Sequence, residues 1–148
     1  MARLVSFTGR LLFAFLFLSS GLQKLTHFDI VTGGPEMYIV EPKIDVFISN
    51  FERFIGVQVP LYKARPGPTS YPYLLLIAIV LELVGGVLFT LGSKFGAFLL
   101  LLFLVAVTPV MHAFWDLPPD TAEHLNDMIN FFKNTALAGS LLFYIDSY

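Results

Sequence analysis

Apolar residues along this 148-residue chain are gathered into four long runs. The runs cover residues 4–22, 71–92, 95–115 and 128–145, and the last is more polar at its start. A helix of about 20 apolar residues is long enough to cross a hydrocarbon core of roughly 30 Å. The pattern therefore predicts an all-α membrane protein with four transmembrane helices.

The first run carries Arg10 within it and no acidic residue comes before Asp29. We interpret it as a retained helix, with a signal peptide as the alternative, because Arg10 divides the apolar core and no A-x-A site follows. A start that bears arginine and lacks acids is compatible with import into an organelle.

The second and third runs are separated by only a short hinge, Gly92, Ser93 and Lys94. A connection of this length makes the two helices antiparallel neighbours. The sequence thus predicts an antiparallel four-helix bundle in one domain, residues 1–148, with both chain ends on the same side of the membrane.

Residues 23–70 form a long connection between the first two runs. Glycines and prolines predict turns at residues 33–35 and again between residues 60 and 68. Between these turns, apolar side chains recur at three- and four-residue intervals: Ile44, Phe47, Ile48, Phe51, Phe54 and Ile55. This pattern predicts an amphipathic helix of about three turns, too short to span, which lies in the membrane interface or caps the bundle.

Composition supports the membrane interpretation, since 56% of the residues are hydrophobic and only 14% are charged. Cysteine is absent, which excludes disulfides, thiolate metal sites and iron–sulfur clusters. The formal net charge is −2 and there is no basic run, so nucleic acid is not an expected partner. The lipid bilayer and other membrane subunits are the expected partners.

Glu82 stands in the middle of the second apolar run. An ionised carboxylate facing lipid is costly, so Glu82 is expected to face the bundle interior and to have a cationic partner. Arg10 and Lys133 lie on other predicted helices within reach of it. We therefore predict a structural intramembrane ion pair of Glu82 with Arg10 or Lys133, with a proton or ligand site as the alternative.

A second interpretation of the intramembrane polar groups is a ligand pocket. In that case His112, Glu82 and Lys133 would line a site for a quinone or small lipid. His112 and Asp116 are also four residues apart, a spacing that can bind a divalent metal, but the signal is weak. No metal site and no cofactor are predicted.

Small residues indicate where helices pack closely. Gly85 and Gly86 follow Glu82 one turn along the same face, and the fourth run carries small residues four apart. The predicted helix-packing residues are Gly85, Gly86, Gly139, Ala136 and Ser140.

Catalytic signatures are not found in the sequence: there is no P-loop, dinucleotide glycine motif, nucleophile elbow or H-E-x-x-H. Nothing pairs a nucleophile with a base. We predict no catalytic residues and a protein that is not an enzyme.

Several segments resemble those of a known family. They include GGP at 33–35, PKIDVF at 42–47, GVQVP at 56–60, TP at 108–109 and NTALAGSLLF at 134–143. With the helices placed, the chain resembles the DoxX-like membrane proteins, and among them it is most similar to the plant HR-like lesion-inducing family.

The resemblance implies a four-helical membrane protein without a settled biochemical activity. Wider relatives include subunits associated with quinone-linked thiosulfate oxidation. The lesion-inducing branch tends to have a lysine where this chain has Glu82, and such an inversion of charge favours a structural role for this residue.

Together, the residues and the resemblance predict a non-enzymatic accessory or scaffold subunit of a larger membrane complex. A multi-pass protein of an organelle inner membrane of the respiratory type, in the mitochondrion, is favoured, with the endoplasmic reticulum as the alternative. Two other functions stay open: a quinone- or lipid-binding redox subunit, and a stress or cell-death membrane protein that acts alone.

Overall fold

The structure is a computed structural model that describes residues 1–57 and 71–147, and every regular element in this part of the chain is helical. The elements are α1 (Ala2–Thr26), α2 (Met37–Ile55), α4 (Tyr71–Thr90), α5 (Lys94–Met111), the short 3-10 helix η1 (Phe114–Asp116) and α6 (Ala122–Asp146). The turn predicted between residues 60 and 68 lies outside the described residues. The all-helical prediction is confirmed.

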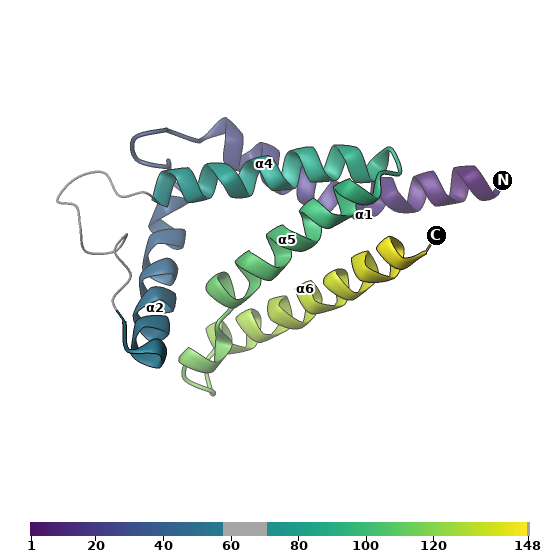
Figure 1. Ribbon diagram of the computed structural model, residues 1–148. Helices are drawn as coiled ribbons and strands as arrows, with labels where there is room; N and C mark the ends of the chain where they lie inside the picture. The colour runs from purple at the N-terminus through teal and green to yellow at the C-terminus, as the bar shows by residue number, and fades with distance from the viewer. Residues whose placement is uncertain (58–70, 148) are drawn as a thin grey trace.

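The four long apolar helices pack in the order α1, α4, α5, α6 (Figure 1). Neighbours run antiparallel: along α1 and α4, Arg10 lies beside Thr90 and Lys24 beside Glu82. Within the described residues, α6 packs mainly against α5 and has no comparable interface with α1. Both chain ends lie at the same end of the molecule (Figure 1). The helices therefore form a row more than a closed bundle.

The predicted close turn between the second and third apolar helices is confirmed. Residues 91–93 join α4 to α5, which pack against each other. Gly92 adopts φ +93°, a left-handed backbone that favours glycine. The core beneath this turn is built from all four helices: Ala14, Phe17, Phe89, Ala97, Leu100, Phe103, Leu104 and Leu141.

Helix α2 begins at Met37, earlier than the apolar spacing predicts, and Pro42 lies inside its N-terminal part. The turn before it explains why. Gly33 and Gly34 both have left-handed φ values, and a side chain at Gly34 would overlap the carbonyl oxygen of His27. The glycines therefore reverse the chain tightly against the end of α1, so α2 can start at once.

One part of the apolar face of α2 packs against the start of α4. Met37 and Ile44 are buried there with the apolar side chains of α4. Tyr71 of α4 also donates a hydrogen bond of 2.6 Å to Asp45 of α2. Of the two positions predicted for this helix, the structure shows it covering the end of the α4–α5 pair (Figure 1).

Among the residues that the structure describes, three segments are long and apolar enough to cross a membrane: Ala2–Thr26, Tyr71–Thr90 and Lys94–Asp116. In hydrocarbon the backbone must bond within its own segment, which helices achieve. Helix α6 has 25 residues and is long enough to span. Its first half is polar, however, and the helix does not count among the segments of sufficient length and hydropathy. The chain is thus a multi-pass membrane protein with three spans supported, in place of the four predicted.

Candidate functional site

Glu82 is the most deeply placed charged group in the described part of the chain, with 2% of its surface exposed. As predicted from its position in the second apolar run, the Glu82 side chain faces the interior between the helices. Its partner is Lys24 of α1, whose Nζ lies 2.8 Å from Oε2 of Glu82. The Lys24 ammonium also lies 5.4 Å from the centre of the Phe103 ring on α5. One ion pair therefore links three helices.

The prediction that Glu82 pairs with Arg10 or Lys133 is wrong. Arg10 donates instead to the carbonyl oxygen of Thr90, at 3.2 Å, and to the hydroxyl of Ser6. Lys133 is exposed on α6, and α5 rather than α6 packs beside α4. Because α1 continues to Thr26 beyond its apolar run, Lys24 lies on the helix next to Glu82. The available signal was the position of Lys24 in the sequence. It precedes the first helix-breaking residues after the apolar run, Gly33 and Gly34, and can therefore belong to the first helix.

Basic side chains gather where helices end near the chain termini. Arg10 reaches the last carbonyl of α4, and Nζ of Lys94 donates to the carbonyl of Ile145 at 2.8 Å. Cations at the C-terminal ends of helices are stabilised by the helix dipole and satisfy free carbonyl groups. These groups therefore have a structural role at this end of the molecule.

A second polar cluster lies at the opposite end of the helices. Asp127 of α6 is 5% exposed, and its two oxygens contact different partners. Lys43 of α2 approaches one oxygen at 3.2 Å, and Nδ1 of His112 approaches the other at 3.3 Å. Lys43 also donates to the carbonyl of Met111. This cluster ties α2 to the ends of α5 and α6.

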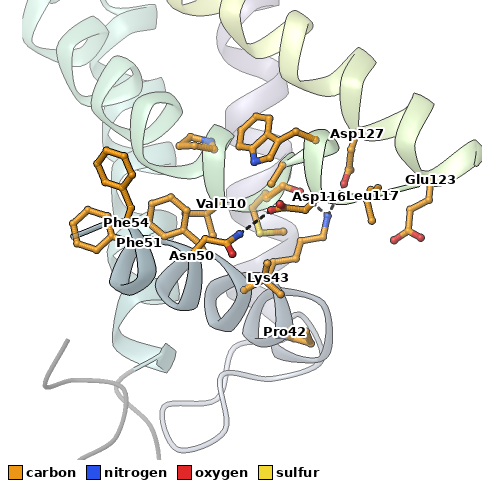
Figure 2. A pocket seen from close by; sticks show the side chains of 16 residues that line it. Pro42, Lys43, Asn50, Phe51, Phe54, Val110, Asp116, Leu117, Glu123 and Asp127 are labelled. Carbon is orange, nitrogen blue, oxygen red and sulfur yellow. Dashed lines mark hydrogen bonds and ion pairs between the residues drawn. The ribbon is translucent and has the colours of Figure 1, made fainter. Parts of the chain in front are cut away.

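Beside this cluster, α2, the end of α5, η1 and the start of α6 line a half-open cavity of about 420 Å³ (Figure 2). We call it the α2 cavity. Asn50 of α2 donates a 3.1 Å hydrogen bond to Asp116 of η1 in its wall. Phe51 and Phe54 lie at one end in Figure 2, with Asp127 and Glu123 at the other. The remaining apolar and aromatic lining includes Val46, Phe47, Pro109, Val110, Met111, Ala113, Trp115 and Leu117.

The residues predicted to line a ligand pocket do not come together. Glu82 lies in the pair with Lys24, Lys133 is exposed on α6, and His112 faces Asp127. None of the three lines the α2 cavity. Sequence reasoning missed Lys43 and Asp127, because their contact joins α2 to α6 across the fold. The amphipathic pattern of α2 was the only signal for the cavity wall.

The metal-binding alternative for His112 and Asp116 does not match the geometry. His112 contacts Asp127, whereas Asp116 accepts a hydrogen bond from Asn50. Across residues 1–57 and 71–147, no group of three or more histidine and acidic side chains is placed to hold a metal ion.

The small residues divide into two groups. Gly85 and Gly86 are buried, and an added methyl group at Gly86 would lie 2.7 Å from a methyl group of Leu18 on α1. In contrast, Ala136, Gly139 and Ser140 are exposed, and a methyl group added at Gly139 would meet nothing within 4 Å. Because α6 turns this face outward, no close helix packing at these three positions is seen among the described residues, and packing there against a further helix stays a prediction.

Gly96 is a packing glycine that the sequence reasoning missed. A methyl group at this position would overlap the backbone of Leu88 and Phe89 on α4. The glycine therefore sets how closely α4 and α5 approach. Gly96 stands four residues after Gly92, and this small-x-x-x-small spacing was the available signal.

Two comparisons with known proteins find matches. A chain of similar length, the inner membrane protein YphA of Escherichia coli (strain K12), is 26% identical over 127 residues, which are 82% of this chain and 89% of that protein. No solved structure matches the chain. The family model described as HR-like lesion-inducing matches residues 2–147. Since this match covers nearly the whole chain, the protein belongs to the HR-like lesion-inducing family.

Proposed function

We propose that this protein is a non-enzymatic accessory or scaffold subunit of a larger membrane protein complex. The outward face of α6 is the observation that carries this proposal. Of the 25 residues of α6, only Asp127 and Leu141 are buried within the chain. The helix therefore uses a narrow face for its own fold and leaves most of its surface available.

Six of the exposed residues of α6, all apolar or small, form a stripe along the helix. They follow one another at three- and four-residue intervals: Leu125, Ile129, Phe132, Ala136, Gly139 and Phe143. This spacing is typical of the seam between two helices. The small residues lie in its second half, with Ser140 beside them, where a partner helix can approach the backbone closely.

The proposal includes a membrane-spanning α6. Its length is about 37 Å at 1.5 Å per residue, which is sufficient for a fourth span. Its polar first half lies beside the end of α5, where Asn134 donates a 3.2 Å hydrogen bond to Thr108. A polar segment in this position is stable near lipid headgroups or against another protein subunit. Both settings agree with an accessory subunit.

We propose the mitochondrial inner membrane as the location, with the endoplasmic reticulum as the alternative, and a place within the wider DoxX-like group. The similar E. coli protein is named as an inner membrane protein. The arginine-bearing and acid-free first 28 residues of this chain are compatible with organelle import.

The test is the native mass of the chain after gentle detergent extraction from its own membranes, with identification of the proteins that co-purify. We expect the chain in a stoichiometric complex much larger than its own mass. Gly139→Leu should release it from this complex, because the added side chain occupies the approach of a partner helix.

Gly9→Leu is the matched control. Gly9 is an exposed helical glycine of α1, and an added methyl group there meets nothing, as at Gly139. This variant should stay in the complex. Recovery of the wild-type chain as a monomer would contradict the proposal and favour a stress or cell-death protein that acts alone.

A further inference from the structure

The α2 cavity has a size and a position that suit part of a lipid molecule. Small-molecule sites measure roughly 300–1,000 Å³, and this cavity has about 420 Å³. It lies beside the end of α5, where the apolar Lys94–Asp116 segment finishes. At this level of a membrane the polar headgroups meet the hydrocarbon, so an amphiphile can place its head and tail in different surroundings.

The charges of the cavity wall favour a head that ends in a cationic group. Four charged residues of the described part of the chain line it, and two of them, Lys43 and Asp127, neutralise each other in an ion pair. The other two are Asp116 and Glu123, neither of which is in an ion pair among residues 1–57 and 71–147. The wall thus has an excess negative charge of two at neutral pH, which repels an anionic head.

Aromatic rings supply the second part of the recognition. Phe47 and Phe51 are stacked with their ring centres 6.4 Å apart. The Trp115 ring makes edge contacts with the rings of Phe114 and Phe131, at 5.3 and 5.6 Å between ring centres. These contacts hold the rings in place before a ligand arrives. An ammonium group is attracted to the face of such rings, and tryptophan binds it best.

The geometry points to the α2 cavity as a binding site for a lipid with a zwitterionic head that ends in an ammonium group, such as phosphocholine. The ammonium lies near Trp115, Asp116 and Glu123. The aromatic and aliphatic residues of α2 and α5 contact the glycerol and the upper acyl chain. This binding function is separate from the proposed role of α6 in a complex.

Trp115 makes the proposal directly measurable, because it is the only tryptophan of the chain and it lines the cavity. The full chain in maltoside micelles is titrated with phosphatidylcholine that carries bromine on its acyl chains, and the quenching of tryptophan fluorescence is followed. The same titration uses brominated phosphatidylglycerol. We expect saturable quenching, with about fivefold less phosphatidylcholine than phosphatidylglycerol needed for half of the effect.

Variants separate the cavity from the general lipid surface. Glu123→Gln and Asp116→Asn should each reduce the preference for phosphatidylcholine, since each removes one negative charge from the wall. Asp120→Asn is the matched control, because Asp120 is exposed in the same loop but does not line the cavity. It should leave the preference unchanged.

Three results would overturn the proposal. Equal quenching by the two lipids in the wild-type chain would show that Trp115 senses only the bulk lipid. Loss of the preference in Asp120→Asn to the same extent as in the wall variants would make the effect one of total charge. Competition by free choline at the same concentration as the lipid would assign the cavity to a soluble cation.

Discussion

The Nζ atom of Lys24 lies 2.8 Å from Oε2 of Glu82, and it lies 5.4 Å from the centre of the Phe103 ring. These three side chains come from α1, α4 and α5, so one partly buried contact fixes the relative position of three helices. In a low-dielectric interior, removing either member of such a pair leaves the other as an uncompensated charge, which destabilises the fold. The consequence is a clear expectation for stability.

We expect Glu82→Gln to lower the free energy of unfolding by about 3 kcal/mol, because the substitution leaves the Lys24 ammonium without its counter-charge. Thermal unfolding of the purified chain in detergent measures this change. The double variant Lys24→Met with Glu82→Leu should recover most of the loss, since apolar side chains replace both charges. An unchanged free energy of unfolding in Glu82→Gln would contradict a structural role for the pair.

Gly96→Ala is expected to destabilise the chain by about 1–3 kcal/mol, because the methyl group would overlap the α4 backbone at Leu88 and Phe89 and that backbone cannot turn away. Gly9→Ala is the control. It has open space around it and should be neutral or stabilising by up to about 1 kcal/mol through helix propensity. Equal melting temperatures of the two variants would show that the α4–α5 contact is looser than the structure has it.

Lys43→Met should loosen α2 without unfolding the core, since Lys43 joins α2 to Asp127 and to the carbonyl of Met111. Amide hydrogen exchange within Met37–Ile55 is expected to rise about tenfold, while exchange in α4 stays the same. Arg53→Met, which changes an exposed cation of the same helix, is the control. A similar rise in exchange in the control would assign the effect to the lost charge alone.

The stability of the loop after α1 depends on pH through the carboxyl group of Asp29. The backbone N–H groups of Thr32 and Val31 donate to one oxygen of Asp29 at 2.9 and 2.7 Å, and these bonds, that of Thr32 first, lower the pKa of the carboxyl below 3.8. Because the folded pKa is the lower one, the contribution to loop stability is complete above pH 3.8 and is lost as the pH falls through the folded pKa.

Nuclear magnetic resonance can follow this titration through the amide signals of Val31 and Thr32. Both signals should move with one midpoint below pH 3.8. Asp29→Ala should remove the transition while the signals of α4 stay in place. A midpoint at or above pH 3.8 would contradict the hydrogen bonds in this loop.

Much of the architecture could be predicted from the chain alone, because membrane helices are encoded locally. The apolar runs predict α1, α4 and α5, and the short hinge at Gly92 predicts the antiparallel α4–α5 pair. The spacing of Ile44, Phe47 and Phe51 predicts α2, although its true start depended on how the glycine turn at residues 33–34 packs against His27.

The partners of the polar groups could not be predicted in the same way. Depth in the membrane made Arg10 and Lys133 look suitable for Glu82, but depth does not say which helices are neighbours. The packing order places Lys24 beside Glu82 and leaves Lys133 exposed. Likewise, the contact of Lys43 with Asp127 joins residues 84 positions apart.

The sequence by itself determined the class of the protein, the segments that become helices and the burial of Glu82, because apolar runs and isolated charges respond to lipid wherever they lie. Only the tertiary structure decided which cation meets that carboxylate, which small residues pack, and where a cavity forms. Those outcomes depend on side-chain contacts between helices distant in the chain, and no periodicity within one helix specifies them.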